Sequence, residues 1–216
     1  MEKTLKQTPI NIIKVVLFGP ESTGKTTISQ KLAKHYNTVW VPEYARDFLQ
    51  EKWNNHRKTC ESNDQLPIAY GQMKLENKLA KKADKILICD TDLLETSVYF
   101  EEYYDKTVDP KLKKAALSNT YNLYLLTYID TPWEQDDIRE NPHIRLEMFK
   151  TFENALKKHN RPYVILKGNI KNRMELAINE IDKILKNKQN LHRFSTNISD
   201  IDTHFLHQQN NENDFQ

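Results

Sequence analysis

The sequence is poor in glycine and cysteine, and it lacks any long apolar run. Its two cysteines, Cys60 and Cys89, form no CxxC pair and no disulfide framework, which fits a reducing compartment. No apolar stretch approaches the length needed to cross a bilayer, and the opening residues MEKTLKQTP contain no signal-peptide core. We therefore expect a cytoplasmic protein.

The sequence also lacks a surplus of charge of either sign. Its 32 basic and 30 acidic residues give a formal net charge of +2. Nothing in that balance demands a nucleic acid or an anionic membrane as partner, so we expect a small-molecule substrate and neither of those. The charge balance does not indicate an oligomeric state.

The order of apolar segments predicts an α/β fold. Strands are expected over residues 12–18, 38–41, 85–89, 123–129 and 163–166, with helices between them and a last helix over 171–186. This alternation predicts one P-loop kinase-type domain, a five-stranded parallel sheet with helices on both faces. We place the domain at residues 12–188, after an N-terminal extension (1–11) and before a polar, poorly ordered tail (189–216).

The segment Gly19-Pro20-Glu21-Ser22-Thr23-Gly24-Lys25-Thr26 matches the pattern G-x-x-x-x-G-K-[ST] of a phosphate-binding P-loop. Two of the four glycines of the chain lie in it. It follows a predicted strand and opens a predicted helix, as the mechanism requires. Lys25 is expected to reach the β- and γ-phosphates, and the Thr26 hydroxyl to bind Mg²⁺. The candidate nucleotide-binding residues are Gly19, Glu21, Ser22, Thr23, Gly24, Lys25, Thr26 and Thr27.

Two aspartates follow the predicted strand at 85–89. Asp90 is expected to hold Mg²⁺ together with Thr26, and Asp92 to share that role or to contact the substrate in catalysis. The alternative for such a position is a helix N-cap, which aspartate also favours.

Among P-loop proteins, a small kinase fits best. No glycine has an aspartate three positions before it, as a GTPase switch needs, and neither NKxD nor LSGGQ occurs. Glu43 follows the second predicted strand, where ligands bind in open α/β sheets, so we expect it to orient the substrate hydroxyl. Arg46, one turn later, is expected to bind substrate. The alternative is that Glu43 is only a favourable carboxylate at the start of a helix, with Arg46 as its i,i+3 ion-pair partner.

The segment after the fourth predicted strand has the character of a lid. It contains Asp136, Asp137 and Arg139, and Arg145 follows at a strong amphipathic helix. We expect Arg139 and Arg145 to neutralise the phosphoryl group during transfer. An exposed loop with ordinary charges is the alternative.

Taken together, these segments resemble the kinase domain of the NadR-type nicotinamide riboside kinases. The similar stretches are GPESTGKTTISQKLAKHYNTVWVPEYAR, ILICDTDLLET, PWEQDDIR and RPYVIL. The resemblance covers about residues 12–186. It implies a P-loop kinase fold, ATP and Mg²⁺ as cofactors, and phosphorylation of the ribose 5′-hydroxyl of nicotinamide riboside to nicotinamide mononucleotide. It also supports Glu43, Tyr44, Arg46 and Asp92 as substrate-binding residues.

A positively charged pyridinium ring favours aromatic faces and carboxylates. Aromatic residues that lie in segments near the expected crevice are Trp40, Tyr44, Tyr70, Tyr99 and Phe100. Packing is the alternative role for each of them. Two other functions stay open, a kinase for another nucleoside or small alcohol and a nucleotide-binding regulatory protein with little turnover.

Overall fold

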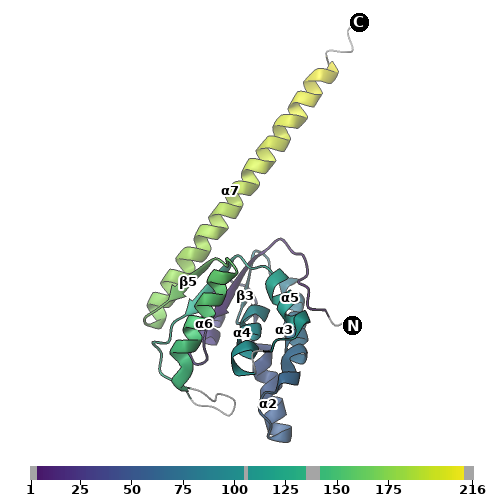
Figure 1. Cartoon of the computed structure of the whole chain (residues 1–216). Helices are drawn as coiled ribbons and strands as arrows, with labels where there is room; N and C mark the ends of the chain where they lie inside the picture. Colours follow the sequence, from purple (N-terminus) through teal and green to yellow (C-terminus); the bar gives the residue numbers. More distant parts are fainter. Residues whose placement is uncertain (1–3, 105–106, 135–141, 212–216) are drawn as a thin grey trace. The chain divides into compact units, whose positions relative to one another are not determined.

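The fold is built on a parallel sheet of five strands in a computed structural model (Figure 1). The structure describes the backbone of residues 4–104, 107–134 and 142–211, and the side chains of residues 4–104, 107–134 and 143–190. The strands are β1 (Ile13–Phe18), β2 (Trp40–Val41), β3 (Ile86–Cys89), β4 (Leu123–Thr127) and β5 (Tyr163–Leu166). They lie in the order β2-β3-β1-β4-β5, so β1 is central. The predicted fold class is confirmed.

The strand positions follow from burial. All six residues of β1 are buried, because β3 and β4 flank it and helices cover its faces. Parallel strands buried in this way need continuous apolar runs, which IKVVLF supplies. The paired residues Val16 with Cys89 and Phe18 with Leu126 show that β1, β3 and β4 end near one another. The loops that follow these strands therefore meet at one edge of the sheet.

Helices connect the strands. They are α1 (Lys25–His35), α2 (Tyr44–His56), α3 (Gln65–Ala80), α4 (Leu93–Tyr103), α5 (Pro110–Ser118), α6 (Arg145–Lys158) and α7 (Ile170–Asn211), with short 3-10 turns at Ser62–Asp64 and Pro142–Ile144. Helix α4 contacts α3, α5 and α6, and this layer packs on Val16, Phe18 and Leu126 of the sheet (Figure 1). Helix α1 packs against β1, β2 and β3 with its buried residues Ile28 and Leu32.

The chain divides into two compact units, Met1–Ile178 and Asn179–Gln216. Helix α7 runs past the expected end at residue 186 to Asn211, through the segment for which we expected poor order. No glycine or proline occurs between residues 171 and 211 to end the helix. The domain boundary at residue 188 stays a prediction. Among the described residues, no helix is both long and apolar enough to cross a membrane.

Candidate active site

The P-loop lies between β1 and α1 and wraps around the start of the helix. Gly19 and Gly24 have φ angles of 133° and 85°, a region that favours glycine. A Cβ atom at Gly19 would lie 2.8 Å from the Thr127 hydroxyl oxygen, so the loop approaches the end of β4 too closely for a side chain. The Thr23 hydroxyl donates to the Pro20 carbonyl (2.7 Å), and its oxygen lies 2.6 Å from the hydroxyl oxygen of Thr127. Glycine and threonine thus fix the loop against β4.

Lys25 is the first residue of α1, and its ammonium turns back over the loop. The Nζ atom donates to the carbonyls of Gly19 (2.6 Å) and Pro20 (3.1 Å) and lies 3.0 Å from the Glu95 carboxylate. Burial opposes the charge of Lys25, but the carboxylates of Glu95, Glu43 and Asp90 outweigh it and raise the pKa of the amine. Lys25 therefore keeps its positive charge in a site dominated by anions.

A cleft of about 980 Å³ opens over the loop. Glu21 to Thr27 line it, so every predicted nucleotide-binding residue except Gly19 faces the cleft. Glu43 and Arg46 at the start of α2 line the same cleft. The structure thus brings together the cradle and the two charged residues that the sequence assigned to the substrate.

Glu43 is held in place through its two neighbours in the chain. Gln72 of α3 is buried, accepts a hydrogen bond from the Tyr44 N–H (2.8 Å), and donates to the Pro42 carbonyl (3.2 Å). The backbone on both sides of Glu43 is therefore clamped to α3, and its side chain lines the cleft. Gln72 also lines the cleft, and the sequence did not single it out.

Tyr44 lies differently from the expectation. A Cβ atom at Gly71 would lie 2.0 Å from the Tyr44 ring, so the ring packs flat onto the one place in α3 that has no side chain. Tyr44 does not line the cleft, and neither do Trp40 and Tyr70. These contacts favour the packing alternative for Tyr44, whose role toward substrate stays a prediction.

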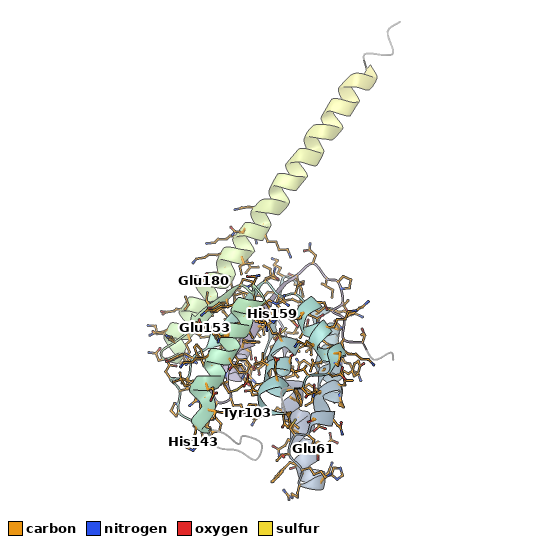
Figure 2. The ribbon with its side chains drawn as sticks, in the orientation of Figure 1. Glu61, Tyr103, His143, Glu153, His159 and Glu180 are labelled. Carbon is orange, nitrogen blue, oxygen red and sulfur yellow. The ribbon has the colours of Figure 1, made fainter. Side chains whose placement is uncertain are left out.

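One wall of the cleft comes from α4. Four aromatic residues at its C-terminal end line the cleft, Tyr99, Phe100 and Tyr103 of the last turns and Tyr104 directly after the helix. The rings of Tyr99 and Tyr103 lie 5.7 Å apart, and Tyr103 lies near the end of the helix (Figure 2). Burial, then Glu21, Glu95 and Glu43, raises the pKa of Tyr99 well above its usual range. Tyr99 and Phe100 therefore lie where the sequence analysis expected them, and Tyr103 and Tyr104 extend the wall.

Asp90 follows β3 and is buried beside the P-loop. Neither of its carboxylate oxygens has a hydrogen-bond partner in the described part of the chain. Burial raises its pKa to about 7, and Glu43 adds to the rise, while Thr26, Lys25 and Arg46 oppose it. A buried carboxylate whose oxygens are not satisfied by the protein, close to the Thr26 hydroxyl, fits a hard cation that is held through few protein ligands. No cluster of three or more His, Cys, Asp or Glu ligands occurs in the described residues.

Asp92 has a different environment. Its Oδ1 accepts the Glu95 N–H (2.9 Å), its Oδ2 accepts the Tyr124 hydroxyl (2.8 Å), and it caps α4. Burial raises its pKa to about 6, against the effect of those two donors. Asp92 does not line the cleft. These contacts favour the helix-cap alternative, and its catalytic and substrate-binding role stays a prediction.

Of the residues expected in the lid segment, some lie outside the described part of the chain and one, Arg145, lies within it. Asp136, Asp137 and Arg139 lie outside the described residues. The Arg145 guanidinium donates to the carbonyls of Ser22 (3.0 Å) and Thr131 (3.1 Å), and it lies over the Trp133 ring. Arg145 thus contacts the P-loop through the Ser22 carbonyl but does not line the cleft, and its catalytic role stays a prediction.

Two further residues were missed from the sequence. Glu95 pairs with Lys25, as described above. Arg173 of α7 is 2% exposed and donates to the Thr23 carbonyl (2.6 Å), the Gly168 carbonyl (2.9 Å) and Asp130. It therefore ties the P-loop to the turns after β4 and β5. A capping-type aspartate (Asp92) three residues before Glu95 was the only local signal for either residue.

The unpartnered carboxylate of Asp90 gives a first test. Burial raises the pKa of Asp90 to about 7 in the folded protein, whereas the pKa in the unfolded chain lies near 4, so stability falls as pH rises between these values. In metal-free buffer, Asp90→Asn is expected to raise the free energy of unfolding at pH 8 by about 1–3 kcal/mol, with the gain lost near pH 4. Phosphate transfer should fall in the same variant.

Urea titrations at pH 4 and pH 8 measure this effect. Asp92→Ala serves as the contrasting variant, because it removes two hydrogen bonds and a helix cap and should destabilise the protein. Equal destabilisation of both variants at pH 8 would contradict an unpaired Asp90.

The fold and this site define a P-loop kinase domain. The chain belongs to the AAA-domain family AAA_28, whose model matches residues 14–173. It is 28% identical over 131 residues to the trifunctional NAD biosynthesis/regulator proteins NadR of Salmonella typhimurium and Escherichia coli. The match covers 61% of this chain and 32% of each relative, so the chain spans about a third of their length.

Solved structures show the same fold. A NadR protein in complex with NR superposes with a TM-score of 0.67 at 23% identity, over 80% of this chain and 51% of that one. A deoxyadenosine kinase from M. mycoides has a TM-score of 0.60 at 18% identity, over 79% of this chain and 100% of that one. At these identities the likeness concerns the fold.

Proposed function

We propose that this domain transfers the terminal phosphate of ATP to the 5′-hydroxyl of nicotinamide riboside, in the cytoplasm. The observation that carries the proposal is one continuous cleft that joins the P-loop, the carboxylate of Glu43 and the aromatic wall of α4. A cleft of about 980 Å³ lies within the range of ligand sites, which supports the binding of a phosphate donor next to an acceptor.

The residues have defined roles in this reaction. The 5′-oxygen attacks the γ-phosphorus, the bond from that phosphorus to the β,γ-bridging oxygen breaks, and ADP leaves. Glu43 orients the hydroxyl and takes its proton. Lys25 and the backbone N–H groups of the loop stabilise the charge on the phosphate oxygens. Asp90 and Thr26 would hold Mg²⁺, which neutralises phosphate charge when bound.

The choice of acceptor rests on charge and shape. Nicotinamide riboside carries a cationic ring, and Glu21, Glu43, Tyr99 and Tyr103 all line the cleft. Such a cation is attracted to aromatic faces and to anions. The NadR relatives are named for NAD biosynthesis, and one solved NadR structure is a complex with NR, which supports the same acceptor.

A transfer assay with Mg-ATP tests the proposal. Nicotinamide riboside is compared with its neutral 1,4-dihydro form, which keeps nearly the same shape without the charge, and with deoxyadenosine and other neutral nucleosides. We expect kcat/KM for the cationic form to exceed that for the dihydro form by about tenfold. Preference for deoxyadenosine would keep the mechanism and overturn the acceptor. Transfer to none of them would favour a nucleotide-binding regulatory protein.

A further inference from the structure

Near the start of α4, the carboxylate of Glu95 pairs with a residue outside its own helix. The spacing Asp92-x-x-Glu95 is that of a capping box, in which the glutamate accepts the N–H of the capping residue. Only half of the box forms, because Asp92 accepts the Glu95 N–H while the Glu95 carboxylate turns to Lys25. The box of Glu61 and Asp64 forms both halves. The Glu95 side chain is therefore directed to the P-loop lysine instead of to its own helix.

This pairing lowers the stability of the fold, because it leaves one buried carboxylate oxygen unsatisfied. The Oε2 atom of Glu95 is buried and has no hydrogen-bond partner in the described part of the chain. Burial raises the pKa of Glu95 well above its usual range, although Lys25 opposes the rise. A buried carboxylate with one partner and one bare oxygen is a poor structural element, since an apolar side chain would fill the same space without that penalty. The arrangement therefore suggests a functional role.

The partner that Glu95 serves is Lys25. The ammonium has three N–H donors, and its three acceptors are the Gly19 carbonyl, the Pro20 carbonyl and Glu95. Of these acceptors only Glu95 carries a charge. The two carbonyls fix the ammonium along the loop, and the carboxylate keeps it protonated in a buried place.

We propose that Glu95 is a positioning residue of the phosphate transfer, one that holds the Lys25 ammonium in place along the P-loop through their 3.0 Å ion pair. The inference rests on the proposed kinase function. It also gives Asp92 a role that does not require contact with substrate. The Tyr124 hydroxyl of β4 donates to Asp92, and Asp92 accepts the backbone N–H of Glu95. These two contacts hold Glu95, and through it the Lys25 ammonium, in a fixed position relative to the sheet.

The test is Glu95→Gln, which keeps the shape and removes the charge. We expect kcat to fall by about 10–100-fold, because a loosely held ammonium misses the transferring phosphate. The Kd for Mg-ATP at pH 8 should stay within about threefold or tighten, because an anion near the phosphates is removed. A residue that only supports the fold would not separate kcat from ATP binding in this way.

The pH dependence of Mg-ATP binding gives a second readout that needs no acceptor. Without Glu95 the pKa of Lys25 should fall, so the alkaline loss of ATP affinity should begin at lower pH than in the wild type. Glu43 and Asp90 also face Lys25 and remain, so the shift is partial. Lys25, Glu43 and Asp92 face Glu95 itself, and so does Tyr99. Binding of a fluorescent ATP analogue between pH 7 and pH 10.5 measures the shift.

Glu76→Gln is the matched control. Glu76 is also fully buried, its Oε1 lies 3.0 Å from Lys14 Nζ, and neither residue lines the cleft. We expect this variant to lose stability while kcat and the alkaline profile stay unchanged. If Glu95→Gln fails to fold, Glu95→Asp takes its place, because it keeps the charge on a shorter side chain. This variant should retain the wild-type pH dependence of Mg-ATP binding but have a reduced kcat.

Two results would overturn the inference. One is a folded Glu95 variant whose kcat lies within about threefold of the wild type, and the other is an alkaline profile that does not move in Glu95→Gln. Failure of the wild type to phosphorylate any nucleoside would defeat the proposed function instead. The nucleotide-binding profile would still decide whether Glu95 controls Lys25.

Discussion

Replacement of Lys25 by alanine is expected to lower phosphate transfer by at least about 10³-fold. The ammonium is the only lysine or arginine charge that the described structure fixes directly on the P-loop carbonyls of Gly19 and Pro20. It lies on the helix that opens the phosphate cradle, where negative charge develops during transfer. Lys31, the next lysine along α1, also lines the cleft, but it lies about 1.7 turns further on and makes no contact with these carbonyls in the described structure.

The variant also has a predictable effect on stability. Alanine at position 25 leaves the buried Glu95 carboxylate without its ion-pair partner. We expect Lys25→Ala to be destabilised at pH 8 and to recover as the pH falls, because Glu95 then takes up a proton. The double variant Lys25→Ala with Glu95→Gln should recover stability at pH 8 without recovering transfer.

Circular dichroism with thermal unfolding, together with a transfer assay on the folded fraction, makes this measurement. Turnover above about one-tenth of the wild-type rate in a folded Lys25→Ala protein would remove the basis for the P-loop assignment.

Replacement of Glu43 by glutamine should lower kcat by about 10²–10⁴-fold and leave the Kd for Mg-ATP almost unchanged. Glutamine keeps the size of the side chain and cannot accept the proton of the acceptor hydroxyl. Gln72 holds the backbone on both sides of position 43, so the substitution should not move the loop. A loss confined to kcat is therefore the signature of a residue that acts on the acceptor.

Single-turnover kinetics and nucleotide titration separate the two quantities. An equal loss of ATP affinity and of rate would instead assign Glu43 to the nucleotide side of the cleft. A rate within a few-fold of the wild type would mean that another group receives the proton.

Much of the fold could be predicted because its signals are local. The apolar runs at β1 and β3 identify buried strands, and GPESTGKT identifies the cradle within eight consecutive residues. These features depend on neighbours along the chain, which the sequence displays directly. The strand order β2-β3-β1-β4-β5 is not local, so the sequence analysis predicted a parallel sheet without its arrangement.

The same contrast between local and distant signals applies to the residues of the site. Lys25 and Glu43 could be singled out because a local motif marks the first and the end of a predicted strand marks the second, and the structure places both at the cleft. Gln72, Glu95 and Arg173 were missed because their roles come from contacts made across the fold, the Arg173 bond to Thr23 spanning 150 positions. Asp92 was expected at the substrate, but its contacts with Tyr124 and Glu95 could not be read before β4 and α4 were in place. Local patterns identify chemistry well and identify supporting residues poorly.

The cleft face of α4 also limits how this domain can change over evolution. Glu95, Tyr99 and Tyr103 are spaced by four residues, so they form one stripe that carries the lysine contact at one end and aromatic rings at the other. Substitutions along the stripe can alter the acceptor while the helix keeps its phase. A one-residue insertion or deletion between Glu95 and Tyr99 would rotate the rings by about 100° relative to the P-loop. Descendants of this domain should therefore vary in the rings of α4 but rarely in its length.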